Sequence, residues 1–154
     1  SGTKVLLMEA PALPVTGNVL DLGCGAGPIA MTMARRSPEC AVWAVDINER
    51  ARQLTRDNAS SLGLTNVTVA TPDEVPDDVM FDVIWSNPPI KVGKQELHDL
   101  LNRWLARLSP DGHAVLVVNK NLGSDSLAKW LTELGWKVKR ISSRQGFRVL
   151  TVKR

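Results

Sequence analysis

A rigid polar segment near the middle of the chain could hold a nucleophile in place. Residues 81–85 form a largely apolar run that predicts a buried strand, and Ser86-Asn87-Pro88-Pro89-Ile90 follows it directly. Two consecutive prolines lack amide donors and fix two φ angles, and Pro88 drives Asn87 towards an extended conformation. The Asn87 amide and the Pro88 carbonyl are then fixed hydrogen-bond acceptors. The alternative is a plain loop in which the prolines only end the strand.

Such a pair of acceptors suits the activation of an amine. The exocyclic amine of a base is a poor nucleophile because its lone pair is delocalised into the ring. One acceptor for each N–H aims the lone pair, and fixed acceptors stabilise the charge that grows on the nitrogen. Positioning supplies much of the remaining rate, so no strong general base is required. We interpret the two histidines, His98 and His113, as structural or surface residues.

A glycine loop precedes this segment in the chain, between a predicted strand at residues 18–22 and a predicted helix at residues 28–36. Glycine occupies every second position of the loop, at Gly23, Gly25 and Gly27. Glycine allows a sharp turn and lets a ligand approach the backbone. A dinucleotide-binding fingerprint would need its third glycine where Pro28 stands. The spacing therefore favours a ligand with a carboxylate and an adenosine over a pyrophosphate.

An acid follows the next predicted strand, 21 residues after Gly25. The carboxylate of Asp46 can accept hydrogen bonds from both hydroxyls of a ribose. The alternative is that Asp46 or Asn48 only caps the helix that follows. Together, the loop and the acid predict a site for a nucleoside cofactor.

Strands and helices alternate along most of the chain. We expect helices at residues 3–9, 28–36, 49–62, 95–108 and 124–134. We expect strands at residues 18–22, 40–45, 67–70, 81–85, 114–118, 137–142 and 147–153. Gly63 and Gly135 are predicted to end helices and Ser124 to cap one, whereas residues 71–80 and 109–112 are predicted to form a loop and a turn.

The central strands are continuous apolar runs, which is typical of a parallel sheet covered on both faces. The last two strands are separated only by residues 143–146, so we expect an antiparallel hairpin. A sheet of this kind binds ligands beyond the carboxyl ends of its strands. The glycine loop, Asp46, the acidic loop and the Asn-Pro-Pro segment all fall on that edge, and so does Arg144 in the hairpin turn.

The composition is that of a globular protein, with 154 residues expected to form a single domain. No apolar run approaches the roughly 20 residues of a membrane span and no signal peptide opens the chain, so we expect a cytoplasmic protein. Cys24 and Cys40 lack the spacing of metal ligands, and no metal site is predicted. A first residue other than Met is consistent with the C-terminal part of a longer protein.

The positive charge is concentrated at the end of the chain. Residues 137–154 carry seven of the 19 Lys and Arg and none of the 16 acids. A basic end on an acidic body indicates a footprint for nucleic acid. The alternative is an edge hairpin that its charges protect from aggregation.

The motifs together resemble the class I S-adenosylmethionine-dependent methyltransferases. The resemblance covers nearly the whole chain and rests on Asp21-Leu-Gly-Cys-Gly-Ala-Gly27, Asp46 and Ser86-Asn-Pro-Pro-Ile90. It implies a Rossmann-like α/β fold, with a mostly parallel seven-stranded sheet and an antiparallel last strand, and S-adenosyl-L-methionine as cofactor. The Asn-Pro-Pro form implies methylation of planar nitrogens. Further segments look closest to the small-subunit ribosomal RNA guanine-N2 methyltransferases and their single-domain relatives: Gly93-Lys94, Asn119-Lys-Asn121 and Gly146-Phe-Arg-Val-Leu150.

The resemblance also implies roles for individual residues. Those implied to bind the cofactor are Asp21, Gly23, Cys24, Gly25, Gly27, Asp46, Ile47, Asp73 (or Glu74) and Asn87, with Gly2-Thr3 at the edge of the pocket. Those implied to act in catalysis are Asn87, Pro88, Pro89 and Ile90. RNA is the implied substrate, with Lys91, Lys94, Arg144 and Arg148 as candidate contacts.

One residue departs from the pattern. An aromatic residue usually follows Asn-Pro-Pro and stacks on the base, but Ile90 stands there, and we expect Trp85 to lie in the core instead. Either another residue holds the base or the substrate is not a standard base. Methylation of a protein amide or small molecule, and a non-catalytic RNA-binding module of the same fold, therefore remain alternatives. A nicotinamide oxidoreductase is disfavoured by Pro28.

Overall fold

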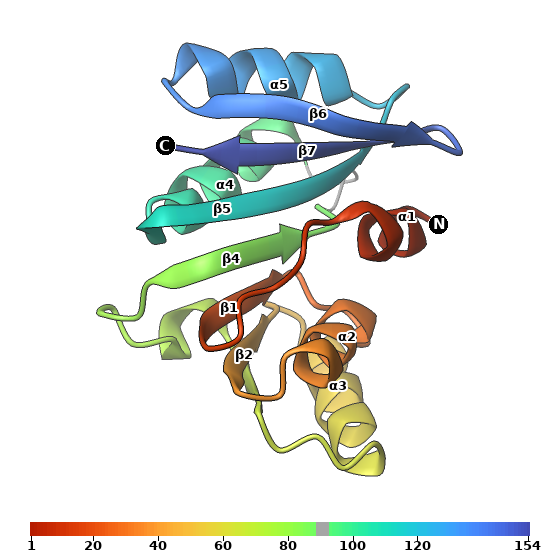
Figure 1. Ribbon diagram of the computed structural model, residues 1–154, viewed down its shortest axis with the longest axis vertical. Coiled ribbons are helices and arrows are strands. Elements are labelled where there is room, and N and C mark those ends of the chain that lie inside the picture. The colour runs from red at the N-terminus through yellow and green to blue at the C-terminus, as the bar shows by residue number, and fades with distance from the viewer. Residues whose placement is uncertain (89–92) are drawn as a thin grey trace.

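The computed structural model describes residues 1–88 and 93–154, and its strands form one seven-stranded sheet (Figure 1). The strand order is β3-β2-β1-β4-β5-β7-β6. The strands are β1 (Gly17–Leu22), β2 (Cys40–Val45), β3 (Val67–Ala70), β4 (Phe81–Ser86), β5 (Leu108–Asn119), β6 (Lys137–Arg144) and β7 (Phe147–Lys153). The helices are α1 (Gly2–Glu9), α2 (Pro28–Arg36), α3 (Glu49–Ser61), α4 (Lys94–Leu105) and α5 (Ser124–Glu133), with a 3₁₀ turn at η1 (Pro72–Glu74).

The five strands from β3 to β5 are parallel, whereas β7 is antiparallel to both β5 and β6. The mostly parallel sheet with an antiparallel last strand is therefore confirmed. The chain order reverses between β1 and β4, the point at which sheets of this type bind ligands beyond their carboxyl ends.

Two apolar cores cover the two faces of the sheet. One core joins the strands to α1, α2 and α3, and the other joins them to α4 and α5. Successive residues of β4 alternate between the two: Val83 and Trp85 enter the first core and Ile84 enters the second. This alternation explains why the strand is apolar on both faces. The Trp85 side chain is fully buried, as expected.

The predicted turn at residues 109–112 is wrong. The helix α4 ends earlier than expected, at Leu105, and the turn residues belong to β5. The pairing of β5 with β4 shifts register between Phe81 and Val83. Pro110 and Gly112 therefore lie in a β-bulge, where both residue types are common. A Cβ at Gly112 would lie 2.8 Å from the Phe81 carbonyl oxygen, which shows how closely the two strands approach.

Other local predictions differ in detail. The cap of α5 is Gly123, with φ of 104°, and Ser124 is the first helical residue rather than the cap. The turn of the last hairpin is only Gln145-Gly146, both with positive φ, so Arg144 lies in β6. Gly63 and Gly135 follow their helices with positive φ, as predicted.

Candidate active site

The glycine loop is fastened to the end of β2. The amides of Gly23 and Cys24 both donate to the Val45 carbonyl oxygen, at 2.8 and 3.0 Å. A Cβ at Gly27 would lie 2.8 Å from Thr55 Cγ2, whereas a Cβ at Gly23 or Gly25 would meet nothing within 4 Å. The loop thus packs tightly against α3 on one side and leaves space for a ligand on the other.

Two polar residues of α3 donate hydrogen bonds to the backbone of the glycine loop. The Thr55 hydroxyl donates to the Gly25 carbonyl oxygen and the Asn58 amide donates to that of Ala26, both at 2.8 Å. Neither Thr55 nor Asn58 is among the site residues predicted from the sequence. Their spacing of three places them on one helical face, but nothing in the sequence showed that this face meets the loop.

Cys24 lies under the loop rather than on its open side. Its side chain is buried and its sulfur lies 3.5 Å from the Thr55 hydroxyl oxygen. Burial raises the pKa of the Cys24 thiol to about 11, so it remains protonated at neutral pH. Its contribution is packing.

Asp46 binds the loop and the start of α3 through its carboxylate. Oδ2 accepts a hydrogen bond from the Gly25 amide at 3.0 Å, and Oδ1 accepts one from the Asn48 amide at 2.9 Å. The predicted alternative that Asn48 caps α3 is confirmed, because its side chain accepts a hydrogen bond from the Ala51 amide, whereas Asp46 is not the cap. Each carboxylate oxygen retains a lone pair that can accept a ribose hydroxyl.

Asp21 carries a buried oxygen that lacks a partner. Its Oδ2 accepts from the Ala30 amide at 2.9 Å, but Oδ1 has no hydrogen-bond partner among the described residues. The pKa of Asp21 is raised to about 7, mainly by burial; the hydrogen bond from the Ala30 amide lowers it and the charge of Asp46 raises it. Because buried polar atoms are normally satisfied, this oxygen is suited to a donor or cation of a ligand, such as the ammonium group of methionine.

The end of β4 brings Asn87 to the same edge of the sheet. The Ser86 hydroxyl, which is buried, donates to the Leu22 carbonyl oxygen at 2.8 Å and so joins the ends of β4 and β1. Asn87 is exposed, and its Nδ2 donates to the Thr3 hydroxyl at 3.2 Å. This contact leaves Asn87 Oδ1 as an acceptor. Pro88 is buried, and the predicted catalytic residues Pro89 and Ile90 lie outside the described residues, as does Lys91.

The two acids that were predicted to lie near the adenine, Asp73 and Glu74, interact with other residues. The Asp73 carboxylate is 93% exposed and pairs with Arg103 of α4 at 2.9 Å. Glu74 accepts from the Thr71 amide in a capping box, and this hydrogen bond lowers the pKa of Glu74. Neither acid is hydrogen-bonded to the glycine loop. Ile47, by contrast, follows Asp46 directly and is 84% exposed, so an accessible apolar side chain stands next to Asp46 in the chain.

The basic candidates are spread over different surfaces. Lys94 is the first residue of α4. Arg144 pairs across the hairpin with Phe147 and its guanidinium binds Glu9 of α1 at 2.7 Å. Arg148 pairs across the hairpin with Ser143 and binds Asp125 of α5. Arg144 and Arg148 therefore project from opposite faces of the hairpin, and each is matched by an acid.

Neither histidine takes part in this arrangement. His98 stacks on Trp130 with ring centroids 3.6 Å apart, and His113 lies within β5. Burial, and to a lesser degree Lys153, lowers the pKa of His113. Where the structure describes the chain, it contains no cluster of three or more side chains able to ligate a metal. In the same residues no helix has the length and apolar character that a bilayer crossing needs.

Fold and site together define a class I methyltransferase, and the comparison with known families agrees. Residues 1–151 match the methyltransferase small domain, so the chain belongs to this family. It is an S-adenosylmethionine-dependent methyltransferase with S-adenosyl-L-methionine as cofactor.

Three similar proteins show how far the likeness to known sequences and structures extends. An uncharacterized protein of Bacillus subtilis, YbxB, is 31% identical over 99% of this chain and 78% of its own length. Ribosomal RNA small subunit methyltransferase C of Shewanella amazonensis is 33% identical over 86% of this chain, which spans only 40% of that protein. The T. thermophilus 16S rRNA N2 G1207 methyltransferase, solved with AdoMet and guanosine, superposes with a TM-score of 0.75 at 25% identity, over 89% of this chain and 37% of the other.

Proposed function

We propose that this protein methylates the exocyclic N2 amine of a guanine in ribosomal RNA. The observation that carries the proposal is the Asn87 amide, held by Thr3 at the end of β4 and on the same edge as the glycine loop. The relatives that act on ribosomal RNA support the substrate class. Such a substrate fits a cytoplasmic location.

Each part of the cofactor has a matching group in the site. Asp21 Oδ1 would accept from its ammonium group, the space at Gly23 and Gly25 would admit its methionine part, and Asp46 would accept from the ribose hydroxyls. The exposed Ile47 would cover one face of the adenine. When bound, S-adenosyl-L-methionine supplies a methyl group on a positively charged sulfur, which is a strong electrophile.

The residues after β4 would orient the nucleophile. Asn87 Oδ1 and the Pro88 carbonyl oxygen would each accept one N–H of the guanine amine, so that its lone pair points at the methyl group. Both acceptors are held before the reaction, Asn87 by Thr3 and Pro88 by burial. The hydrogen bonds to these acceptors become stronger as the nitrogen gains positive charge, so they stabilise the transition state more than the bound substrate. The nitrogen then releases its extra proton to water.

The experiment is transfer of tritium from labelled cofactor to total RNA and total protein, followed by nucleoside analysis. We expect label in RNA as N2-methylguanosine, and loss of transfer in Asn87→Ala with cofactor binding retained. Label in protein instead would favour methylation of a side-chain amide. Cofactor binding without transfer to any acceptor would favour a non-catalytic module. Transfer that is unchanged in Asn87→Ala would remove this residue from the mechanism.

A further inference from the structure

A flat base beside Asn87 needs an apolar surface to lie on, and Ile90 offers no aromatic ring. The chain contains five Trp, two Phe and no Tyr. Every one of these aromatic residues lies in the part of the chain that the structure describes, so each can be considered in turn.

Six of the seven aromatic side chains are occupied elsewhere. Phe81, Trp85 and Trp104 are fully buried in the cores. The indole of Trp43 donates to Asn18, at the start of β1. Trp130 stacks on His98, and Trp136 lies under the guanidinium of Arg154. None of the six is available to a ligand at the carboxyl edge of the sheet near Asn87.

Phe147 is the remaining ring, and it lies at this edge. It is the first residue of β7 and pairs with Asn119, the last residue of β5. A Cβ placed on Gly2 would lie 3.1 Å from Phe147 Cε1 and 3.2 Å from Asn87 Nδ2. The ring edge and the amide therefore border the same small space beside Gly2. Phe147 packs against the first apolar core but is only partly buried.

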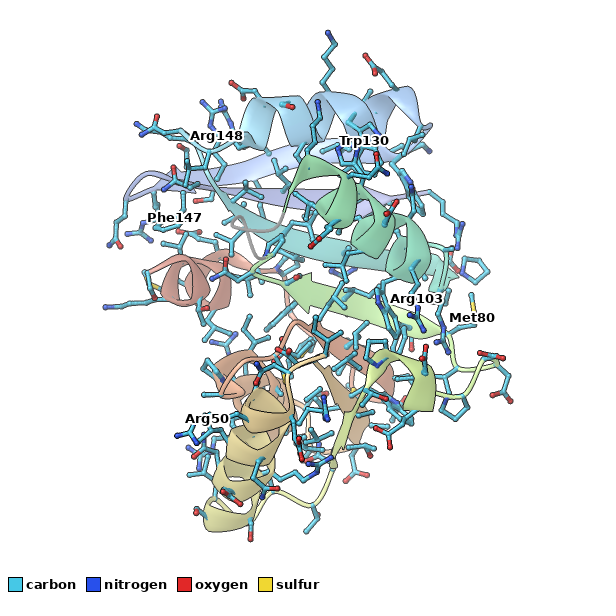
Figure 2. All side chains as sticks on the ribbon, turned by 180° about the vertical axis from the view of Figure 1, so that it is seen from behind. Arg50, Met80, Arg103, Trp130, Phe147 and Arg148 are labelled. Atoms are coloured by element: carbon cyan, nitrogen blue, oxygen red, sulfur yellow. The ribbon has the colours of Figure 1, made fainter. Side chains whose placement is uncertain are left out.

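The backbone around Phe147 holds the ring in this position. The Lys120 amide donates to the Gly146 carbonyl oxygen at 2.9 Å, which ties the hairpin turn to the end of β5. Arg144, the cross-strand partner of Phe147, binds Glu9 of α1. Figure 2 shows Phe147 on the α1 side of the hairpin end and Arg148 near α5. The ring and the Asn87 amide thus both lie beside Gly2, although 60 positions separate them in the chain.

We propose that Phe147 packs against the base whose amine Asn87 holds, and so takes the role of the aromatic residue that the Asn-Pro-Pro segment lacks. This inference rests on the proposed function. The inference adds to the proposed function a prediction of which residue contacts the planar ring of the base. A stacked aromatic contributes enough binding free energy to change affinity for a base by roughly 5- to 150-fold.

The test compares Phe147→Leu with Phe147→Tyr, using methyl transfer to ribosomal RNA and calorimetry with S-adenosyl-L-methionine. Leucine keeps apolar packing under α1 but removes the aromatic face. We expect Phe147→Leu to raise KM for RNA by roughly 5- to 150-fold with cofactor affinity and kcat little changed. Phe147→Tyr keeps the aromatic ring, so its KM for RNA should stay close to that of the unsubstituted protein. Trp136→Leu, a half-buried aromatic at the other end of the hairpin, is the matched control and should leave KM unchanged.

The outcomes separate this proposal from the one on which it rests. Transfer to RNA by the intact protein with an unchanged KM in Phe147→Leu would overturn the role of Phe147 alone. A parallel loss of cofactor affinity and thermal stability, or a KM that is raised in Phe147→Tyr as well, would also overturn it and show a structural role. No transfer to RNA by the intact protein would overturn both proposals.

Discussion

Thr3 and Asn87, 84 residues apart, are joined by a hydrogen bond of 3.2 Å from Asn87 Nδ2 to Thr3 Oγ1. The bond fixes which end of the amide faces the site, since Nδ2 is directed to α1 and Oδ1 is left for the substrate. The helix α1 thereby contributes to orienting the acceptor, although the helix itself contains no residue expected to react.

Thr3→Val should therefore slow methyl transfer while leaving the fold intact. Valine has the shape of threonine but cannot accept the hydrogen bond, so the amide becomes free to rotate. A neutral hydrogen bond contributes about 0.5–1.5 kcal/mol, which corresponds to a loss in kcat of roughly 2- to 12-fold. Thr3→Ser keeps the hydroxyl and should retain most of the activity. Equal rates for valine and serine would mean that the contact does not orient Asn87.

Asp46→Asn should weaken cofactor binding, as measured by calorimetry. The change removes a charge and turns an amide NH₂ towards the amide donors of Gly25 or Asn48. Charge-assisted hydrogen bonds contribute about 1.5–3 kcal/mol, so we expect a loss of affinity of roughly 10- to 150-fold. Asp73→Asn is the control and should change affinity little, because Asp73 is exposed and paired with Arg103. A large effect of Asp73→Asn would instead support its predicted contact with the adenine.

Short-range signals accounted for most of this site and fold. The glycine spacing, Asp46 at a strand end and Asn-Pro-Pro are signals that each span only a few residues. The sequence therefore predicted that the glycine loop, the acid and the Asn-Pro-Pro segment lie at the carboxyl edge of the sheet. Ser-Pro-Asp-Gly at residues 109–112 was misassigned because the same residues suit a turn and a bulge, and only pairing with Phe81 decides between them. Asn87 and Thr3 were both placed near the pocket, but the hydrogen bond between them and the position of Phe147 beside Gly2 could not be predicted, since these depend on tertiary packing.

The protein without cofactor should become less stable as the pH rises from about 4 to about 7. Asp21 has a pKa of about 7 in the folded state, above the ordinary value of 3.8, so the folded state binds more protons across this interval. Stability is then present at low pH and is lost as Asp21 ionises, by up to a few kcal/mol at about 1.4 kcal/mol per pKa unit. Asp21→Asn should flatten this part of the profile of unfolding free energy against pH. An equally steep profile in Asp21→Asn would assign the effect to other groups.

Gly2→Ala should impair transfer more than it impairs folding. Gly2 is helical and buried, so alanine suits the backbone, but its Cβ would lie 3.1–3.3 Å from the Phe147 ring and 3.2 Å from the Asn87 amide. The added methyl group must displace one of them. We expect lower kcat/KM with a nearly unchanged melting temperature. In a double-mutant cycle with Phe147→Leu the two effects should not add, because both act on the same ring.

Arg144 and Arg148 should differ in their effect on RNA binding, although only four positions separate them. Arg144 is half-exposed and shares a hairpin face with Phe147, whereas the Arg148 side chain is only 20% exposed and is bound to Asp125 on the opposite face. Arg144→Gln should weaken RNA binding and reduce the slope of log affinity against log salt by about one unit or less. Arg148→Gln should leave that slope unchanged and lower the melting temperature, because it removes the partner of Asp125 at the start of α5.

The salt dependence decides between the two readings of the basic end. If Arg144 contacts a phosphate, its loss removes one counterion-release event whatever the sequence of the RNA. If the basic residues of the hairpin only protect an exposed edge strand, neither substitution changes the slope, and both variants instead aggregate more readily. Because Glu9 already offsets part of the charge of Arg144, the expected change in slope is smaller than for an unpaired arginine. Glu9→Gln should therefore strengthen RNA binding, which an edge-protecting role of Arg144 does not predict.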